Sequence, residues 1–236
     1  MRALNLHFDR LGKIGSALLL LTLAVACLTS APAHAYDDRI ALVIGNDNYA
    51  GEPLKNAVND ARAMQTALQA LGFKVVFKSN ADYQTMQAAA VEFAKQMDGA
   101  TAAVFYYAGH GIQYSNRNFL IPVNAKLGAE QEIPYFAVDV NQILGSMEDA
   151  NVKHKFIILD ACLNNPFRNL NVSAGLAKST RVPQGTIISY AAAAGAVALD
   201  GEGENGLYTK NLVREIRNPG LTAGGVFDKV GSAVAL

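Results

Sequence analysis

The fold of this chain is set by the stretch Lys155-Phe156-Ile157-Ile158-Leu159-Asp160-Ala161-Cys162, a nearly continuous apolar run that ends in a carboxylate and a thiol. A run of this kind is typical of a strand buried on both faces of a parallel sheet. A second such run, Ala102–Gly111, carries His110 at its end. Because the carboxyl ends of parallel strands open onto one edge of the sheet, where ligands bind, we predict that Cys162 and His110 lie close together there.

The rest of the chain alternates between strands and helices. Further strands are expected at Arg39–Gly45, Lys74–Lys78 and Gly185–Ala191, and helices at Lys55–Leu71, Asp82–Met97, Val138–Met147, Asn205–Arg217 and Thr222–Val234. This alternation predicts an α/β fold, with a mostly parallel central sheet and helices on both faces. A polar turn within Ile112–Val123 predicts a small hairpin just beyond His110.

The first 35 residues have the order of a secretory signal peptide, in which basic residues precede an apolar stretch and an Ala-x-Ala site at Ala33-His34-Ala35. The apolar stretch, Ser16–Leu28, is about 13 residues long, shorter than the roughly 20 needed to span a bilayer. We therefore expect cleavage before Tyr36 and no stable membrane span, with a retained anchor or a lipoprotein modified at Cys27 as the alternatives. The expected organisation is a signal peptide at 1–35 and one domain at 36–236, in the periplasm or secreted.

The composition excludes several classes of protein. Removal of residues 1–35 takes away three of the 20 basic and one of the 20 acidic residues, which leaves a net charge of about −2. A near-neutral chain without a basic cluster has no electrostatic footprint for nucleic acid. A hydrophobic content of 51% with only 17% charged residues argues against disorder and for one domain with a substantial core.

Cys162 is the only cysteine outside the expected signal peptide. A lone thiol in an exported protein has no internal disulfide partner, so we interpret it as a nucleophile activated by His110, with a buried inert thiol as the alternative. The N–H groups of Gly111 and Cys162 are the expected donors to an oxyanion. His154, between two lysines, is expected to be a solvated surface residue. One cysteine and two widely spaced histidines give no spacing for a metal site.

Two blocks resemble the signature blocks of the caspase-like cysteine peptidases, and most closely those of the bacterial members grouped with metacaspases. They are Tyr106-Tyr107-Ala108-Gly109-His110-Gly111 and Asp160-Ala161-Cys162-Leu163-Asn164-Asn165-Pro166-Phe167, supported by blocks at 41–46, 54–61 and 200–209. The resemblance implies a caspase-hemoglobinase-type fold and a His110–Cys162 dyad. It covers the chain from about Arg39 to its end.

The resemblance also implies a substrate preference. In metacaspases, the acidic residues that match Asp60 and Asp160 line the pocket for the substrate residue before the cut. Two carboxylates in a recessed pocket favour Arg or Lys, because a buried cation needs paired charge. The alternatives are a surface position on the first helix for Asp60 and a structural role in capping the turn after its strand for Asp160.

The chain departs from the family pattern at several positions. Leu163 stands where bacterial relatives commonly carry Arg, Ala108 stands where many metacaspases have Ser, and the stretch 191–195 lacks a proline often found there. The family continues into a last strand beyond the helix at Thr222–Val234, so the C-terminal end is expected to be truncated. Leu163–Gln184 is expected to be a long, exposed and mobile loop, with Lys178 and Arg181 as candidate sites of self-cleavage and an ordinary solvated loop as the alternative.

The function expected from these observations is that of an exported cysteine endopeptidase that acts on peptides or proteins. We expect a monomer with no cofactor and no nucleic-acid partner, and the sequence leaves calcium dependence open. One alternative is a weak or inactive caspase-like module that binds peptides. The other is a cysteine amidase acting on cell-wall amides, which the same dyad could serve.

Overall fold

The computed structural model describes residues 39–162, 167, 170, 172, 176–177, 182–191 and 203–234, and of Cys162 it describes the backbone alone. The expected signal peptide lies outside these residues. The described strands form one seven-stranded sheet, of which five strands run parallel in the order β2-β1-β3-β6-β7. They are β1 (Arg39–Gly45), β2 (Lys74–Ser79), β3 (Ala102–Tyr114), β6 (His154–Cys162) and β7 (Thr186–Tyr190). The expected α/β fold is confirmed.

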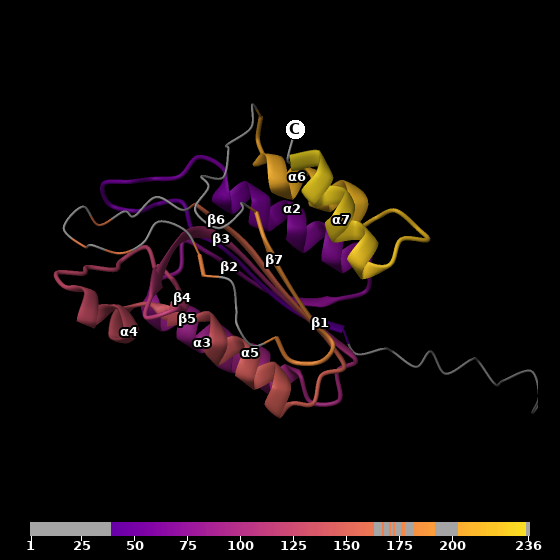
Figure 1. The fold of residues 1–236 in the computed structure, drawn as a ribbon, viewed down its shortest axis with the longest axis horizontal. Helices are drawn as coiled ribbons and strands as arrows, with labels where there is room; N and C mark the ends of the chain where they lie inside the picture. The colour runs from indigo at the N-terminus through magenta and orange to yellow at the C-terminus, as the bar shows by residue number, and fades with distance from the viewer. Residues whose placement is uncertain are drawn as a thin grey trace, which may run out of the picture. The chain divides into compact units, whose positions relative to one another are not determined.

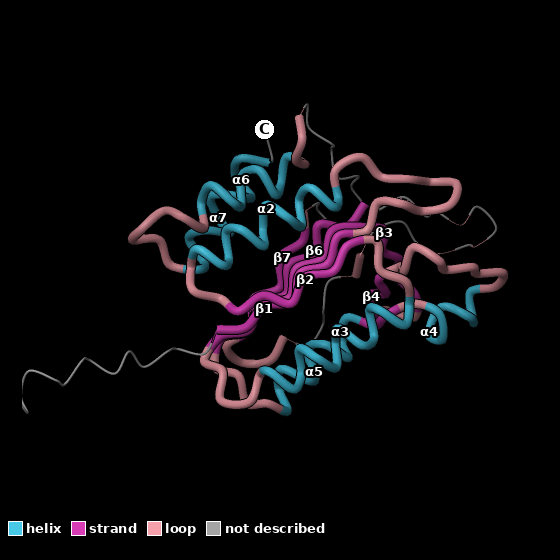
Figure 2. The backbone as a smooth tube through the Cα atoms, turned by 180° about the vertical axis from the view of Figure 1, so that it is seen from behind, coloured by secondary structure: helices cyan, strands magenta, loops and turns pink. Residues whose placement is uncertain are grey.

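Helices cover both faces of the sheet (Figures 1 and 2). One face carries α2 (Ala57–Ala70), α6 (Leu207–Glu215) and α7 (Ala223–Val234), and the other carries α3 (Tyr83–Gln96) and α5 (Val140–Asp149). A 3₁₀ turn (Glu130–Glu132) and α4 (Ile133–Phe136) lie beyond the carboxyl end of the parallel strands. Each face has its own hydrophobic core. No helix in the described ranges is both long and apolar enough to cross a membrane.

Local sequence explains where these elements begin and end. All residues of β1 after Arg39 are buried, as expected for a strand covered on both faces. Gly72, with φ of +83°, follows the end of α2, since glycine adopts this backbone conformation without strain. Asp82 caps α3, because its side chain accepts a hydrogen bond of 2.8 Å from the N–H of Thr85.

The strand that carries His110 does not end there, and this corrects the sequence analysis. β3 pairs in parallel with β6 as far as His110, and from Gly111 it pairs antiparallel with β4 (Arg117–Leu120). The hairpin expected in this region is therefore present, with positive φ at Ser115 and Asn116 in its turn. β1 ends opposite Ala108, and beyond that point β3 pairs with its own return strand.

The helix expected at Val138–Met147 is also revised at its start. Val138–Asp139 forms β5, which pairs antiparallel with β4, and α5 begins only at Val140. The Asp139 side chain accepts a hydrogen bond of 2.9 Å from the N–H of Asn141 and so caps the helix. The apolar period alone does not show where a strand gives way to a helix.

The described residues of the segment after Cys162 pack against the protein. Leu170 and Leu176 are each 6% exposed, and Phe167 and Val172 lie partly buried in the cluster around the hairpin. Exposure of this loop is thus the wrong expectation for Leu170 and Leu176, whereas its mobility stays a prediction. Lys178 and Arg181 lie outside the described residues, as do Leu163 and 192–195.

Candidate active site

His110 and Cys162 face each other on neighbouring parallel strands. They form the last pair of the β3–β6 ladder, with Asp160 opposite Ala108 two residues earlier. The structure thus brings the two residues singled out from the sequence to the same edge of the sheet. His154 begins β6 at the opposite end and is exposed, as expected.

The imidazole of His110 is buried and oriented by one backbone carbonyl. The side chain is 2% exposed, and its Nε2 lies 2.8 Å from the carbonyl oxygen of Glu52. A carbonyl oxygen only accepts, so Nε2 carries the proton and Nδ1 is the basic nitrogen of the neutral ring. Among the described residues Nδ1 has no hydrogen-bond partner. Burial lowers the pKa of His110, although the hydrogen bond to Glu52 and the charge of Glu52 oppose the shift.

Two tyrosines hold the backbone of His110. The Tyr49 hydroxyl accepts a hydrogen bond of 3.0 Å from the His110 N–H, and the Tyr107 hydroxyl donates one of 2.8 Å to the His110 carbonyl. The rings of Tyr49 and His110 lie 4.5 Å apart between centroids. A Cβ on Gly109 would lie 2.5 Å and 2.7 Å from the hydroxyl oxygens of Tyr107 and Tyr49, so only glycine leaves room for this network.

Sequence reasoning missed Tyr49 and the carbonyl of Glu52. Both belong to the loop between β1 and α2, which carries no apolar period and no motif for a catalytic role. Nothing in the sequence indicates that this loop folds over the end of β3.

The backbone pattern directs the N–H of Gly111 toward the side of β6. The N–H of Ile121 donates to the carbonyl of His110 at 3.0 Å, which makes His110 a hydrogen-bonded position of the hairpin ladder. Antiparallel pairs alternate, so Gly111 and Leu120 face each other without exchanging hydrogen bonds. The polar groups of Gly111 therefore point away from β4, toward the end of the strand that carries Cys162.

Asp60 is buried, and its interpretation as a surface residue is wrong. It is 4% exposed on the face of α2 that turns toward the sheet. Its Oδ1 accepts hydrogen bonds of 2.9 Å from the side-chain amide of Asn205 and from the N–H of Gly206. These contacts join α2 to the start of α6, and they come from residues that sequence reasoning did not assign to the site.

Asp160 is half-buried and receives hydrogen bonds from two hydroxyl groups. Its Oδ2 lies 2.6 Å from Oγ1 of Thr209 and 3.3 Å from the hydroxyl of Tyr106. The two hydroxyls are themselves 2.6 Å apart. Burial, and then the charges of Asp160 and Asp60, raise the pKa of Tyr106 well above its ordinary value, so Tyr106 remains a donor. The role of Thr209 was not foreseen, although it lies in a block that carries the family resemblance.

The two carboxylates converge on Gly206. A Cβ at Gly206 would lie 3.1 Å from Oδ2 of Asp60 and 4.0 Å from Oδ2 of Asp160. Strand residues two apart share one face of a sheet, so the backbone position of Cys162 is on the same face as Asp160. The arrangement places two acidic side chains beside the end of β6, where they can bind a cationic group.

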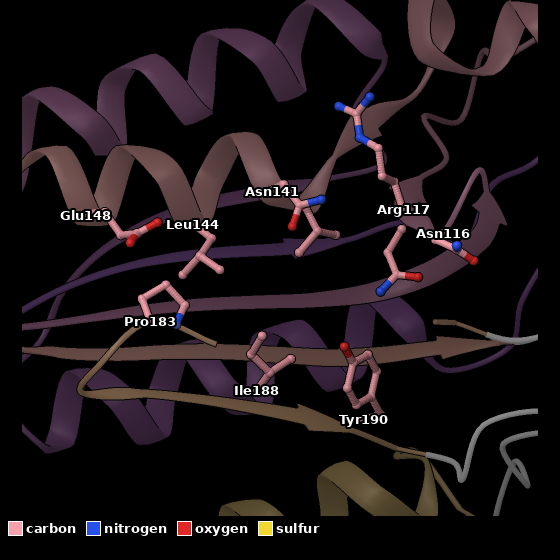
Figure 3. Close-up of a pocket in the computed structure, with 10 residues that line it drawn as sticks. Asn116, Arg117, Asn141, Leu144, Glu148, Pro183, Ile188 and Tyr190 are labelled. Atoms are coloured by element: carbon pink, nitrogen blue, oxygen red, sulfur yellow. The ribbon is translucent and has the colours of Figure 1, made fainter. Parts of the chain in front are cut away.

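A separate hollow of about 350 Å³ lies between the hairpin, α5 and β7 (Figure 3). Asn141, Leu144 and Glu148 of α5 form one wall, and Ile188 and Tyr190 of β7 form the facing wall. His110, Gly111, Asp60 and Asp160 are not among the described residues that line it. Within the described residues no group of three or more His, Cys, Asp or Glu side chains is placed to hold a metal ion.

Comparison with known proteins identifies the family. A family model described as the caspase domain matches residues 38–235. The human mucosa-associated lymphoid tissue lymphoma translocation protein 1 and its mouse homologue are each 28% identical over 179 residues, which are 74% of this chain and 21% of the relative. The chain thus spans about a fifth of the length of these curated relatives. The crystal structure of the Drosophila initiator caspase Dronc has the same fold, with a TM-score of 0.61 and 14% identity over 84% of this chain and 73% of that one. The chain belongs to the caspase-domain family of cysteine peptidases.

Proposed function

We propose that this chain is an exported cysteine endopeptidase that cleaves peptide bonds after Arg or Lys. His110 and Cys162 form the dyad, the N–H groups of Gly111 and Cys162 bind the oxyanion, and Asp60 and Asp160 bind the basic side chain of the substrate. The observation that carries the proposal is that His110 and Cys162 are the last pair of their ladder, with the basic nitrogen of His110 selected by the carbonyl of Glu52.

The reaction follows from these groups. Nδ1 of His110 takes the thiol proton, and the sulfur of Cys162 attacks the substrate carbonyl carbon, whose oxygen becomes an oxyanion. His110 then gives its proton to the leaving amine, and the carbon–nitrogen bond breaks to leave a thioester. Water loses a proton to Nδ1 and attacks the thioester, which releases the carboxylic acid and returns the proton to the thiolate.

The acidic pair supports a preference for basic residues. Asp60 and Asp160 approach the same point near Gly206, and amide, hydroxyl and backbone groups donate hydrogen bonds to them. Hydrogen bonds donated to a carboxylate favour its charged form. A guanidinium or ammonium group would therefore be attracted, and the carboxylate of a substrate Asp would be repelled.

The order of the first 35 residues supports export, and the near-neutral charge of the remainder supports peptide or protein substrates rather than nucleic acid. The proposed location is the periplasm or the medium. N-terminal sequencing of the exported protein tests this part, and a mature chain that begins at Tyr36 is the expected result.

Peptide substrates that differ only in the residue before the cut test the mechanism and the specificity. The wild-type protein should cleave after Arg and Lys and not after Asp. Cys162→Ala should abolish turnover, and His110→Ala should lower kcat by about 10²–10⁴-fold, since acid–base help is lost.

Asp160→Asn should lower kcat/KM for Arg more than for norleucine, because the cation loses a charged partner. The matched control is Asp149→Asn, at an exposed carboxylate of α5, which should behave like the wild-type protein.

The other outcomes discriminate between the alternatives. Turnover that survives in Cys162→Ala contradicts the dyad, and better cleavage after Asp contradicts the pocket assignment. If a thiol-reactive peptide probe labels Cys162 but the protein turns over no peptide substrate, the chain is a peptide-binding module. Release of cell-wall amides without peptide cleavage indicates an amidase.

A further inference from the structure

The segment that follows Cys162 returns to the sheet at Leu176 and Ala177. The side-chain amide of Asn118 donates to the carbonyl of Ala177 at 2.8 Å, and the N–H of Ala177 donates to Oδ1 of Asn118 at 2.7 Å. One side chain thus satisfies both backbone groups of Ala177, as a neighbouring strand would. Asn118 is only 7% exposed, so breaking this exchange would leave buried polar groups without partners.

Leu176 packs directly against Gly111. A Cβ at Gly111 would lie 3.2 Å from Cδ2 of Leu176 and 3.3 Å from Cβ of Ala161. Leu176 belongs to the core shared with α3 and α5, whereas the acidic pair binds groups of α6 on the opposite face. Leu176 therefore supports Gly111 from behind and does not enter the face that carries the acidic pair.

The contact between Asn118 and Ala177 lies at the edge of a hollow. Asn118 lines the hollow of about 350 Å³ between the hairpin, α5 and β7. The exchange between Asn118 and Ala177 holds this edge of the hairpin to the segment that follows Cys162.

We propose that Asn118, Ala177 and Leu176 form a clasp, in which Asn118 and Leu176 are positioning residues for the N–H of Gly111. The inference rests on the proposed function, in which Gly111 binds the oxyanion. Oxyanion donors act only when they are held in place before charge develops. The clasp thus couples the segment after the nucleophile to stabilisation of the transition state, without contact between the clasp side chains and the substrate.

The test compares Asn118→Leu and Leu176→Ala with the control Asn141→Leu, whose side chain lines the same hollow and is exposed. The expected result for the two clasp variants is a kcat about 10–100-fold lower, smaller than the loss of a whole oxyanion donor, with KM within about twofold. Alkylation of Cys162 by iodoacetamide forms no oxyanion, so its rate should stay within about twofold of wild type. Leu176→Met, which keeps the volume, should restore kcat.

Hydrogen exchange at the Ala177 amide reports the clasp independently of activity. Protection should be present in the wild-type protein and in Asn141→Leu and be lost in Asn118→Leu. If the Ala177 amide is unprotected in the wild-type protein, the clasp does not exist. If the wild-type protein protects this amide but cleaves no peptide, the proposed function is wrong, and so is the positioning role that rests on it. The positioning role is also rejected if kcat is unchanged in both clasp variants. It is rejected as well if kcat and the rate of Cys162 alkylation fall by the same factor. If Asn118→Leu does not fold, Asn118→Asp replaces the donor with a carboxylate oxygen of similar size, and the same split between kcat and alkylation is required of it.

Discussion

Single residues distant in sequence set the chemistry of His110. Tyr49 covers the imidazole and binds its backbone, and the Glu52 carbonyl selects which ring nitrogen is basic. The acidic pair follows the same pattern, since Asp160 is oriented by Thr209 of α6. The orientation of His110 and Asp160 therefore depends on residues that lie outside the two signature blocks.

The pH dependence of kcat/KM tests the environment of His110. The neutral imidazole is the base, so activity should fall as pH falls through its pKa, and burial places this acid limb below the ordinary histidine value. Tyr49→Leu removes the covering ring and admits water, which weakens the desolvation, so the acid limb should move to higher pH. Tyr49→Phe keeps the ring and should leave the limb in place. An acid limb at the same pH in Tyr49→Leu would contradict the role of the ring in burying His110.

At the scale of elements, the close approach of β1 to α2 holds Asp60 over the end of the sheet. A Cβ at Gly45 would lie 2.6 Å from both the carbonyl oxygen of Ala57 and the Cβ of Ala61. The helix can therefore rest on the strand only because Gly45 has no side chain. Asn46, which follows and is fully buried, bonds through its Oδ1 to the N–H of Ala81 at 2.8 Å and so ties the ends of β1 and β2 together.

Gly45→Ala should destabilise the protein by about 1–3 kcal/mol, as expected for overpacking between two fixed backbones. The matched control is Gly145→Ala within α5, where a Cβ would meet nothing within 4 Å. That change should stabilise the protein by about 0.5–1 kcal/mol, because alanine is the better helix former. Urea denaturation of the three proteins measures both effects. Equal stability of Gly45→Ala and wild type would show that the strand and helix can move apart without cost.

At the scale of the whole molecule, the two hydrophobic cores pack on opposite faces of one sheet. The loop after Cys162 separates β7 in sequence from the other strands of that sheet. β7 pairs in parallel with β6, and α6 packs beside α2, so the portion after the loop is joined to the portion before it by backbone pairing and by a common core. A cut in the loop would break one peptide bond and none of these contacts.

We expect self-cleavage after Lys178 or Arg181, because both are basic residues of the kind the acidic pair would select. A cut after Lys178 requires that Ala177 first separate from Asn118. Mass spectrometry of purified wild type and Cys162→Ala should show the cut in the wild type alone. The two pieces should elute together on size exclusion, since the pairing of β6 with β7 survives. A cut of equal extent in Cys162→Ala would indicate an outside protease, and an uncut, fully active wild type would exclude processing.

The strands and the approach of His110 to Cys162 could be predicted from sequence because they depend on local composition. Buried parallel strands are continuous apolar runs, and their carboxyl ends lie at one edge of the sheet. The stretches Lys155–Cys162 and Ala102–Gly111 were therefore sufficient to predict that Cys162 and His110 lie at the same edge. Asp60 and Asp160 were reached through the family resemblance, and the structure brings them to one point near Gly206.

Only the tertiary structure decided where β3 ends, what orients His110 and what lies behind Gly111. Continuation of β3 past His110 depends on which strand is available as a partner, and that is a property of the assembled sheet. The contacts of Tyr49 with His110, of Thr209 with Asp160 and of Asn118 with Ala177 join residues between 49 and 61 positions apart. Such contacts form when separate segments are packed together, and no local periodicity or propensity encodes them.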